Sequence, residues 1–233
     1  QGATTLFTTE AVESWKPGDR IVLPDTRQLT LAERNTYVPQ IETLTIGAAT
    51  GGTQHSLIGS LQFDHKGARD GNGLLEFLPH VANLTRNVVI RSENPAGTRG
   101  HVLTNHQADV DIRYAEFDDL GRTKAEECLD SAIFDEMGNP IYIGVNQIGR
   151  YALHLHHVMG PMTTPANGFQ ATLVGNVING SPKWGIVIHD THFALVQGNV
   201  VGGAVGAGIM LEGGNEFEDV VERNIVVNSQ GSG

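Results

Sequence analysis

Three histidines fall within four residues in the segment GRYALHLHHV, which runs from Gly149 to Val158. His154 and His156 alternate there with Leu153 and Leu155, so a strand over this segment would show imidazoles on one face and leucines on the other. Neutral imidazole nitrogens bind divalent transition metals, and imidazole also transfers protons near neutral pH. Packing alone rarely requires this pattern, so the neighbours of the strand in space decide which chemistry is available.

Two later segments, WGIVIHD and AGIMLEG, repeat the pattern of YALHLH and supply candidate neighbours. Their alignment puts Ala152, Gly185 and Gly208 at one position, at spacings of 33 and 23 residues. If the three segments are neighbouring strands, the alternation of side chains sends six apolar residues into a core. These are Leu153, Leu155, Ile186, Ile188, Ile209 and Leu211.

The same alignment predicts a column of polar side chains on the outer surface. His156, His189 and Glu212 occupy equivalent outward positions, and neighbouring strands lie about 4.8 Å apart. His154 precedes the column by two residues on the same face, and Asp190 follows at the turn, within reach of it. Clustered titratable groups of this kind mark functional sites more often than a lone histidine does.

Four interpretations of this column stay open. It would bind a divalent metal, zinc-like or calcium, through His154, His156 and His189. It would act as an acid–base catalyst on a sugar, with Glu212 or Asp190 holding the imidazole tautomer. It would hydrogen-bond a carbohydrate without catalysis, or it would be a solvated face with no function. The predicted catalytic residues are His156, His189, Glu212, Asp190 and Arg150, of which the arginine would face a uronate carboxylate or pair with a nearby acid.

Candidates outside the column have less support. His65 lies in the motif FDHKG, and His192 would join the column or cap its turn. Asp118 and Asp119 would suit calcium, although two acidic residues alone do not make an oxygen cage. Trp184 would stack on a sugar ring or pack inside the protein. The histidines expected in a solvated polar loop are His101 and His106. The sequence lacks the motifs of P-loop, serine-hydrolase and zincin enzymes.

Short strands are the elements that must position these residues. The chain has 29 glycines, and brief apolar alternations recur between Gly, Asn and Asp, whereas helical spacing is confined to Leu31 to Tyr37. Asn176, Asn199 and Asn224 recur at spacings of 23 and 25 residues. A period of that length with two or three strands predicts one coil of a parallel β-helix. The asparagines are expected to hydrogen-bond from coil to coil.

The sequence therefore predicts an all-β fold, a parallel β-helix (solenoid) that forms a single domain over residues 1–233. Residues 1–80 are expected to be its less regular part and residues 81–233 its regular coils. The final residues, NSQGSG, stand where another coil would begin, so we expect the helix to continue beyond residue 233. The absence of an initiator Met and of a leader suggests a mature or excised piece.

The charge and hydropathy of the chain limit the kinds of partner that we expect it to bind. The net charge is -11, from 26 acidic and 15 basic residues. This balance argues against nucleic acid, because phosphate binding needs a basic surface. A run of 18 apolar residues is absent, so no membrane span is expected in this chain. Cys128 is the only cysteine, so the sequence holds no disulfide framework.

Seven segments in order resemble one family: WKPGDRIVL, AERNT, LQFDHKG, VANLTRNVVIRSEN, GRYALHLHHV, GIVIHDTH and IMLEGGNE. They are similar to the β-helix region of the large extracellular proteins with an eight-glycine domain, which include fibrocystin, the cell-migration-inducing hyaluronidase and its transmembrane relative. The resemblance implies a right-handed β-helix, an extracellular or cell-surface location and a polysaccharide ligand, hyaluronan in animal members. Two positions depart from the family pattern: Ala152 replaces a Pro, and Gly213 replaces an Asp.

The first hypothesis is a secreted or cell-surface protein that degrades an acidic polysaccharide by hydrolysis or elimination, with the His/Glu column as its site. The alternative is a non-catalytic carbohydrate-binding or adhesion module, and the third is a structural stalk. The outward His and Glu residues favour the first two hypotheses over the stalk. The missing Asp at Gly213 favours binding over catalysis, so the sequence leaves open whether the protein is an enzyme.

Overall fold

The computed structural model describes residues 1–27, 30–160, 163–166 and 168–231. Contacts divide the chain into two compact units, Gln1–Thr85 and Arg86–Gly233. Strands pair antiparallel in the first unit, whereas the three large sheets of the second are parallel. The expectation of one β-helix domain with a less regular part over residues 1–80 stays a prediction about domains. Parallel pairing begins with the strand at Val88, three residues after the unit boundary.

The first unit is built on one antiparallel sheet. Its strand order is β1-β4-β3-β2-β7, and β5 and β6 form a separate pair. Alternate side chains of the sheet build a small core around Ile21, Leu44 and Ile46. The strands are β1 Thr5–Phe7, β2 Arg20–Leu23, β3 Glu42–Gly51, β4 Gln54–Ile58, β5 Ala68–Arg69, β6 Leu75–Phe77 and β7 Ala82–Asn83.

The segment with helical spacing forms a single turn of 3-10 helix, η1, at Glu33–Thr36. The Glu33 carboxylate accepts hydrogen bonds from the backbone N–H and the hydroxyl of Thr30, so the side chain of Glu33 caps the start of the turn. Among the described residues, no helix is long and apolar enough to span a membrane.

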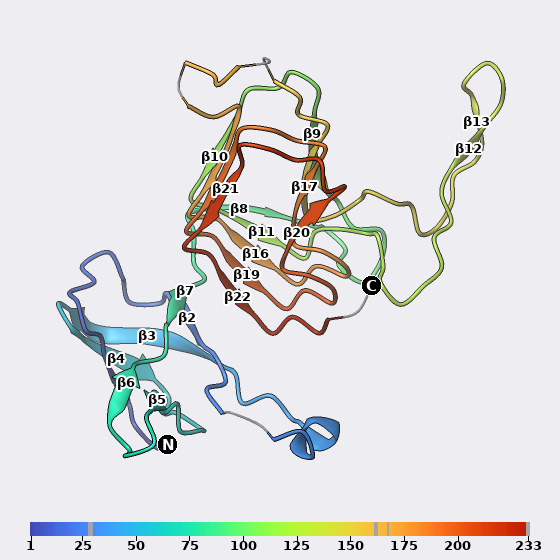
Figure 1. Cartoon of the computed structure of the whole chain (residues 1–233). Helices are drawn as coiled ribbons and strands as arrows, with labels where there is room; N and C mark the ends of the chain where they lie inside the picture. The colour runs from blue at the N-terminus through green and yellow to red at the C-terminus, as the bar shows by residue number, and fades with distance from the viewer. Residues whose placement is uncertain (28–29, 161–162, 167, 232–233) are drawn as a thin grey trace. The chain divides into compact units, whose positions relative to one another are not determined.

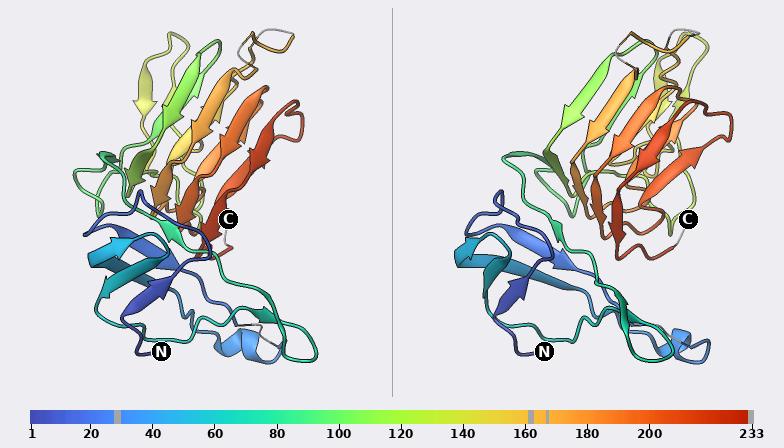
Figure 2. Two further views of the ribbon diagram at one scale, coloured as in Figure 1. Left: turned by 90° about the vertical axis from the view of Figure 1, so that its left-hand side faces the viewer. Right: turned by 60° about the vertical axis from the view of Figure 1, so that its left-hand side comes forward.

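The second unit is a parallel β-helix whose coils share three sheets (Figures 1 and 2). One sheet contains β10 Val110–Arg113, β15 Ala171–Val174, β18 Ala194–Gln197 and β21 Val220–Glu222. The second contains β8 Val88–Arg91, β11 Ala115–Asp118, β16 Val177–Asn179, β19 Val200–Gly202 and β22 Ile225–Val227. The third contains β9 Val102–Asn105, β14 Leu153–His156, β17 Ile186–His189 and β20 Ile209–Glu212.

The coils wind in the right-handed sense that the family resemblance implies. In Figure 1 the chain passes down the left sheet with β10 and β21, across the bottom sheet with β22, and up the right sheet with β17 and β20. This path is anticlockwise, and the red C-terminal coil lies nearest the viewer. A helix that turns anticlockwise as it approaches the viewer is right-handed, so the predicted all-β, right-handed parallel β-helix is confirmed.

Side chains that point inward from the three sheets form the core of this unit. Leu153, Leu155, Ile186 and Ile188 are completely buried, as the alignment predicts. Ile209 is partly buried and packs against the same core. Leu211 is 48% exposed, so its expected burial is wrong. It lies on β20, which is at the edge of its sheet. Among the described strands, β20 has a neighbour in this sheet on one side, β17, and none on the other.

The repeated asparagines form the expected ladder inside the corner between two sheets. The Oδ1 atom of Asn199 accepts the backbone N–H of Asn176 at 2.9 Å, and Oδ1 of Asn224 accepts that of Asn199 at 2.9 Å. The amide nitrogens donate to carbonyl oxygens of the preceding strands, including those of Ile112 and Leu173. Each asparagine therefore satisfies buried backbone groups that the bend would leave without partners.

A long insertion separates β11 from β14 in one coil. It includes a hairpin, β12 Ile133–Phe134 and β13 Pro140–Tyr142, which projects away from the coils in Figure 1. Asn146 is buried at the base of the insertion, where its side chain accepts the backbone N–H of Lys124 and donates to the carbonyl of Glu127. These bonds close the insertion before the chain enters β14.

Candidate functional site

Three neighbouring strands bring the predicted column together. β14, β17 and β20 pair in parallel, and their register aligns His156 with His189 and His189 with Glu212. Leu155, Ile188 and Leu211 alternate with the column on the inward side. The strands pair in this way because the three segments carry the same apolar alternation. A shift of one residue would turn the inward apolar side chains of a strand outward. The alignment made from the sequence is confirmed residue for residue.

Left-handed residues at the corner add two more side chains to the column. His157 and Asp190 directly follow the strand residues His156 and His189, and their φ angles are 54° and 44°. A left-handed residue breaks the alternation of a strand and turns the chain. The side chains of His156 and His157 therefore both lie outside the core, with their rings stacked at 4.0 Å between centroids.

Short contacts between imidazoles and carboxylates link all three strands. An oxygen of Asp190 lies 3.2 Å from Nε2 of His157 and 3.6 Å from Nε2 of His189. Nδ1 of His189 lies 3.6 Å from Oε2 of Glu212. His189 is thus placed between two carboxylates. These four side chains are between 23% and 39% exposed, so a ligand from solvent can reach them.

His154 faces the same way as His156 but is completely buried. The ring of Tyr151 packs against it at 5.0 Å between centroids, and the ring of His156 also lies at 5.0 Å. Nδ1 of His154 bonds to the carbonyl oxygen of Gly149 at 2.9 Å, whereas Nε2 is buried without a hydrogen-bond partner. Burial lowers the pKa of His154 to about 4, so this imidazole is neutral at pH 7.

The surroundings also shift the pKa values of two neighbours of His154, namely His156 and Tyr151. Burial lowers the pKa of His156, and the nearby His157 and His189 lower it further. Burial and the charge of Glu212 raise the pKa of Tyr151, so its hydroxyl keeps its proton and donates to Oε1 of Glu212 at 3.4 Å. The outer face of this sheet therefore combines two imidazoles of lowered pKa, those of His154 and His156, with the oriented carboxylate of Glu212.

Among the residues that the structure describes, two groups of potential metal ligands share His189. One consists of His156, His157 and His189, and the other of His154, His189 and Glu212, and within each group the ligand atoms lie within 4.8 Å of one another. The metal-ligand set expected from the sequence, His154, His156 and His189, is divided between these two groups. That set stays a prediction.

Arg150 lies at the entrance to β14. Its backbone N–H donates to the hydroxyl of Thr123, and its guanidinium donates to the carbonyl of Ile148. The positive charge is near enough to contribute to the lowered pKa of His156. Its expected role toward a uronate stays a prediction.

Several weaker candidates have structural partners instead. His65 in the first unit uses both ring nitrogens, toward Glu42 at 2.8 Å and the carbonyl of Pro24 at 2.8 Å. Trp184 is buried against Tyr151, so it packs and does not present a sugar platform. His192 lies against Phe217, with 4.0 Å between the ring centroids.

The remaining candidates also lie outside the column. Asp119 pairs with Arg99 at 3.2 Å, and Asp118 accepts a hydrogen bond from Asn179. In each case a protein donor occupies a carboxylate oxygen that would otherwise be a calcium ligand. His101 is half-buried, so its expected solvation is wrong, and its pKa is lowered by burial and by Arg122 and Arg150. The loop histidine that is exposed, as expected, is His106.

Sequence reasoning did not single out His157, Tyr151 and Glu216 as site residues. His157 follows a strand directly, which is the only signal for its place at the corner. The Glu216 carboxylate accepts the backbone N–H groups of Asp190 and Gly214. A Cβ atom at Gly213 would lie 3.0 Å from Oε1 of Glu216, so this carboxylate occupies the space beside the position where the resembled family has its Asp.

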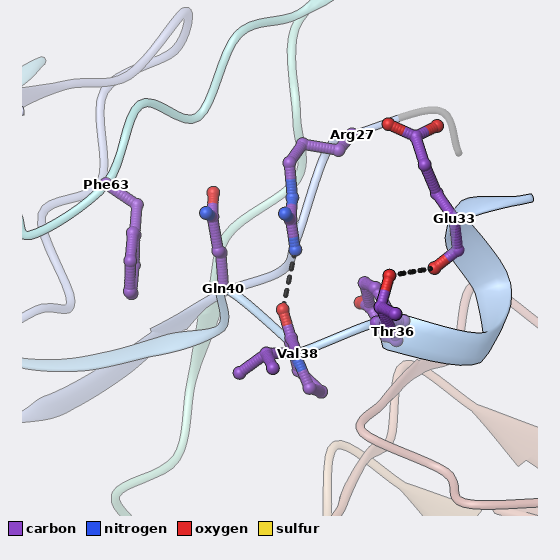
Figure 3. Close-up of a pocket in the computed structure, with 8 residues that line it drawn as sticks. Arg27, Glu33, Thr36, Val38, Gln40 and Phe63 are labelled. Carbon is purple, nitrogen blue, oxygen red and sulfur yellow. Dashed lines mark hydrogen bonds between the residues drawn. The ribbon is translucent and has the colours of Figure 1, made fainter. Parts of the chain in front are cut away.

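The first unit has a hollow of its own beside η1 (Figure 3). Its lining includes Arg27, Gln40 and Phe63, and the Arg27 guanidinium donates to the carbonyl of Val38 at 2.7 Å. The guanidinium also pairs with Asp25 at 2.6 Å. Its charge is thereby balanced within the unit, and none of the predicted site residues lines this hollow.

The fold and the site define a right-handed parallel β-helix with a histidine–carboxylate surface on one sheet. Residues 122–232 match the family model described as CEMIP beta-helix. The chain is 25% identical to human and mouse Fibrocystin-L over an alignment 264 positions long, which covers 99% of the chain. It is 27% identical to human cell surface hyaluronidase CEMIP2 over 217 residues, or 92% of the chain. The resemblance to this group of proteins is therefore confirmed.

The chain spans a small part of these relatives. It covers 6% of the length of Fibrocystin-L and 14% of the length of CEMIP2. The matched range 122–232 includes β14, β17 and β20, so the histidine–carboxylate surface lies within the part that the family model describes.

Proposed function

We propose that the chain is the β-helix part of a secreted or cell-surface protein that acts on an acidic polysaccharide such as hyaluronan. The observation that carries this proposal is the continuous set of contacts from His157 through Asp190 and His189 to Glu212. It extends over three coils on a surface that solvent can reach. A polymer lying across the coils would meet all four side chains. The name of the relative CEMIP2, a cell surface hyaluronidase, supports the same class of substrate and the same location.

The geometry supports cleavage of an acidic glycan, because it groups side chains that can accept and donate protons. His156 is a neutral imidazole with a lowered pKa, which suits the acceptance of a proton from a sugar carbon or from water. His189, held between Asp190 and Glu212, suits the donation of a proton to a leaving oxygen. Arg150 would neutralise the uronate carboxylate. Both hydrolysis and elimination use such an acid–base pair.

The departure at Gly213 does not remove negative charge from the site. Glu216 places a carboxylate beside that position and holds the turn through the N–H groups of Asp190 and Gly214. Asp190 is thereby kept in its left-handed conformation, facing His157 and His189. The carboxylate of Glu216 beside Gly213 therefore supports a functional site at this turn.

Cleavage is tested by incubating the chain with hyaluronan, chondroitin sulfate and a neutral glucan of defined sizes. We expect shortened hyaluronan from the wild type, with loss of at least about 100-fold in rate for His156→Ala and His189→Ala. His80→Ala is the matched control, because His80 is exposed and lies in the first unit. Ultraviolet absorbance of an unsaturated uronate distinguishes elimination from hydrolysis. If His80→Ala lowers the rate as much as His189→Ala does, the column is not the site.

A carbohydrate-binding or adhesion module is the second candidate. The partial exposure of the four contacting side chains suits binding as well as chemistry. Affinity chromatography on immobilised hyaluronan separates the candidates. Retention that His189→Ala removes, together with unchanged glycan size, would support the binding module and contradict cleavage.

A further inference from the structure

The buried histidine of the column has a fixed tautomer. Nδ1 of His154 lies 2.9 Å from the carbonyl oxygen of Gly149, and a carbonyl only accepts hydrogen bonds. Nδ1 therefore carries the proton of the neutral ring, and Nε2 is left with a bare lone pair. The side chain is completely buried, and Nε2 has no partner among the described residues. A buried acceptor without a partner is unfavourable, which calls for an explanation.

A metal-ligating histidine has this arrangement. Such a ring commonly donates its other N–H to a backbone carbonyl, which fixes the tautomer and aims the free nitrogen at the ion. His189 and Glu212 place ligand atoms within 4.8 Å of that of His154. A metal about 2.1 Å from each ligand needs ligand atoms roughly 3–4 Å apart, so small side-chain rotations close the group.

The other contacts of the group also fit an ion. Oε1 of Glu212 accepts the hydroxyl of Tyr151, which leaves Oε2, 3.6 Å from Nδ1 of His189, as the ligand oxygen. Two imidazoles and one carboxylate are a ligand set of zinc enzymes that keep a fourth position for water or substrate. His189 is 25% exposed and Glu212 23%, so that fourth position would face solvent.

We propose that His154, through Nε2, together with His189 and Glu212 binds a divalent transition metal such as Zn²⁺. This inference rests on the proposed function for the use of the site, and it names an ion that the same surface would hold. When bound, the metal acts as a Lewis acid toward a water molecule or a sugar oxygen. The protein contributes the fixed tautomer of His154 and the orientation of Glu212 by Tyr151. The buried rings of Tyr151 and Trp184 exclude water behind His154.

The test uses the 233-residue chain, stripped with a chelator and titrated with Zn²⁺ by calorimetry and with Co²⁺ by visible absorption, without glycan. We expect one ion per chain. Glu212→Gln and His154→Gln should each weaken binding at least about tenfold, and His156→Gln by less than about threefold. Glu212→Gln keeps the proposal falsifiable if His154→Gln fails to fold, because Glu212 lies on the partly exposed face.

Three results would overturn the metal site. They are the absence of stoichiometric binding, binding that Glu212→Gln leaves unchanged, and binding that depends on His156 in place of His154. The last result would assign the ion to the group His156, His157 and His189. Glycan cleavage that survives the chelator would overturn the use of the ion in the reaction and leave the proposed function intact. Metal binding without any cleavage or retention of glycan would support the site and contradict the proposed function.

Discussion

At the scale of single residues, the site could be predicted where two-residue alternation holds. His156, His189 and Glu212 lie in the register that the repeat predicts, because aligned apolar residues must share a core. His157 and the burial of His154 could not be predicted in this way. A left-handed corner places the first on the outer surface, and the side chain of Tyr151 covers the second. Neither the left-handed corner nor the cover by Tyr151 produces a repeating pattern in the sequence.

The burial of the Asp219 carboxylate lowers the stability of the folded protein by an amount that can be measured. Its Oδ1 atom accepts the N–H of Ala194, whereas Oδ2 is buried without a partner among the described residues. Burial raises its pKa to about 6. The folded state therefore binds a proton more tightly than the unfolded state. The resulting stability is fully present below the unfolded pKa of about 3.8 and is lost as the pH rises through 6.

We expect Asp219→Asn to raise the free energy of unfolding at pH 8 by about 1–2 kcal/mol, with the gain disappearing near pH 4. The amide keeps the acceptor for Ala194 and removes the buried charge. Urea unfolding at both pH values measures the difference. Glu218→Gln, an exposed carboxylate in the same turn, controls for net charge. An equal gain at pH 4 and pH 8 would contradict the assignment.

At the scale of elements, the parallel strands of residues 88–227 could be predicted because each coil repeats a short apolar alternation. The antiparallel sheet of the first unit could not, because its strands share no period and pair through hairpins and bulges such as the one between β3 and β4. The exposure of Leu211 also differs from the sequence prediction. An inward position is buried only where a neighbouring coil covers it.

The inward column that contains Leu155 and Leu211 offers a matched pair of substitutions. Leu155→Ala should lower the free energy of unfolding by about 2–5 kcal/mol, because Leu155 is completely buried and a cavity would remain. Leu211→Ala removes the same atoms from a half-exposed position and should cost less than about 1 kcal/mol. Denaturant midpoints of the two variants test the difference. Similar losses would show that Leu211 is also covered in solution.

At the scale of the whole molecule, each compact unit has its own core. One is built around Ile21 and Ile46, and the other around Leu155 and Ile188. Each unit also contains one of the two tryptophans, Trp15 and Trp184. Separate cores predict separate cooperative transitions, with the unit that has the larger core unfolding later.

We therefore expect two urea transitions in tryptophan emission, of which the earlier is absent in Trp15→Phe and the later in Trp184→Phe. Far-ultraviolet circular dichroism should show both steps in all three proteins. Phe is close to Trp in shape, so either substitution should preserve the fold. One coincident transition for both reporters would support the expectation of a single domain over residues 1–233 instead.

The long insertion between β11 and β14 shows how such a solenoid accepts new sequence. β14 pairs with β17 in the same parallel manner as β17 pairs with β20, although only β14 is preceded by a projecting hairpin. Added length at a corner thus leaves His156 beside His189. Loops can therefore be added at this corner while the histidine–carboxylate surface keeps its geometry, and a protein engineer could place a reporter at Met137, which is 83% exposed at the hairpin turn.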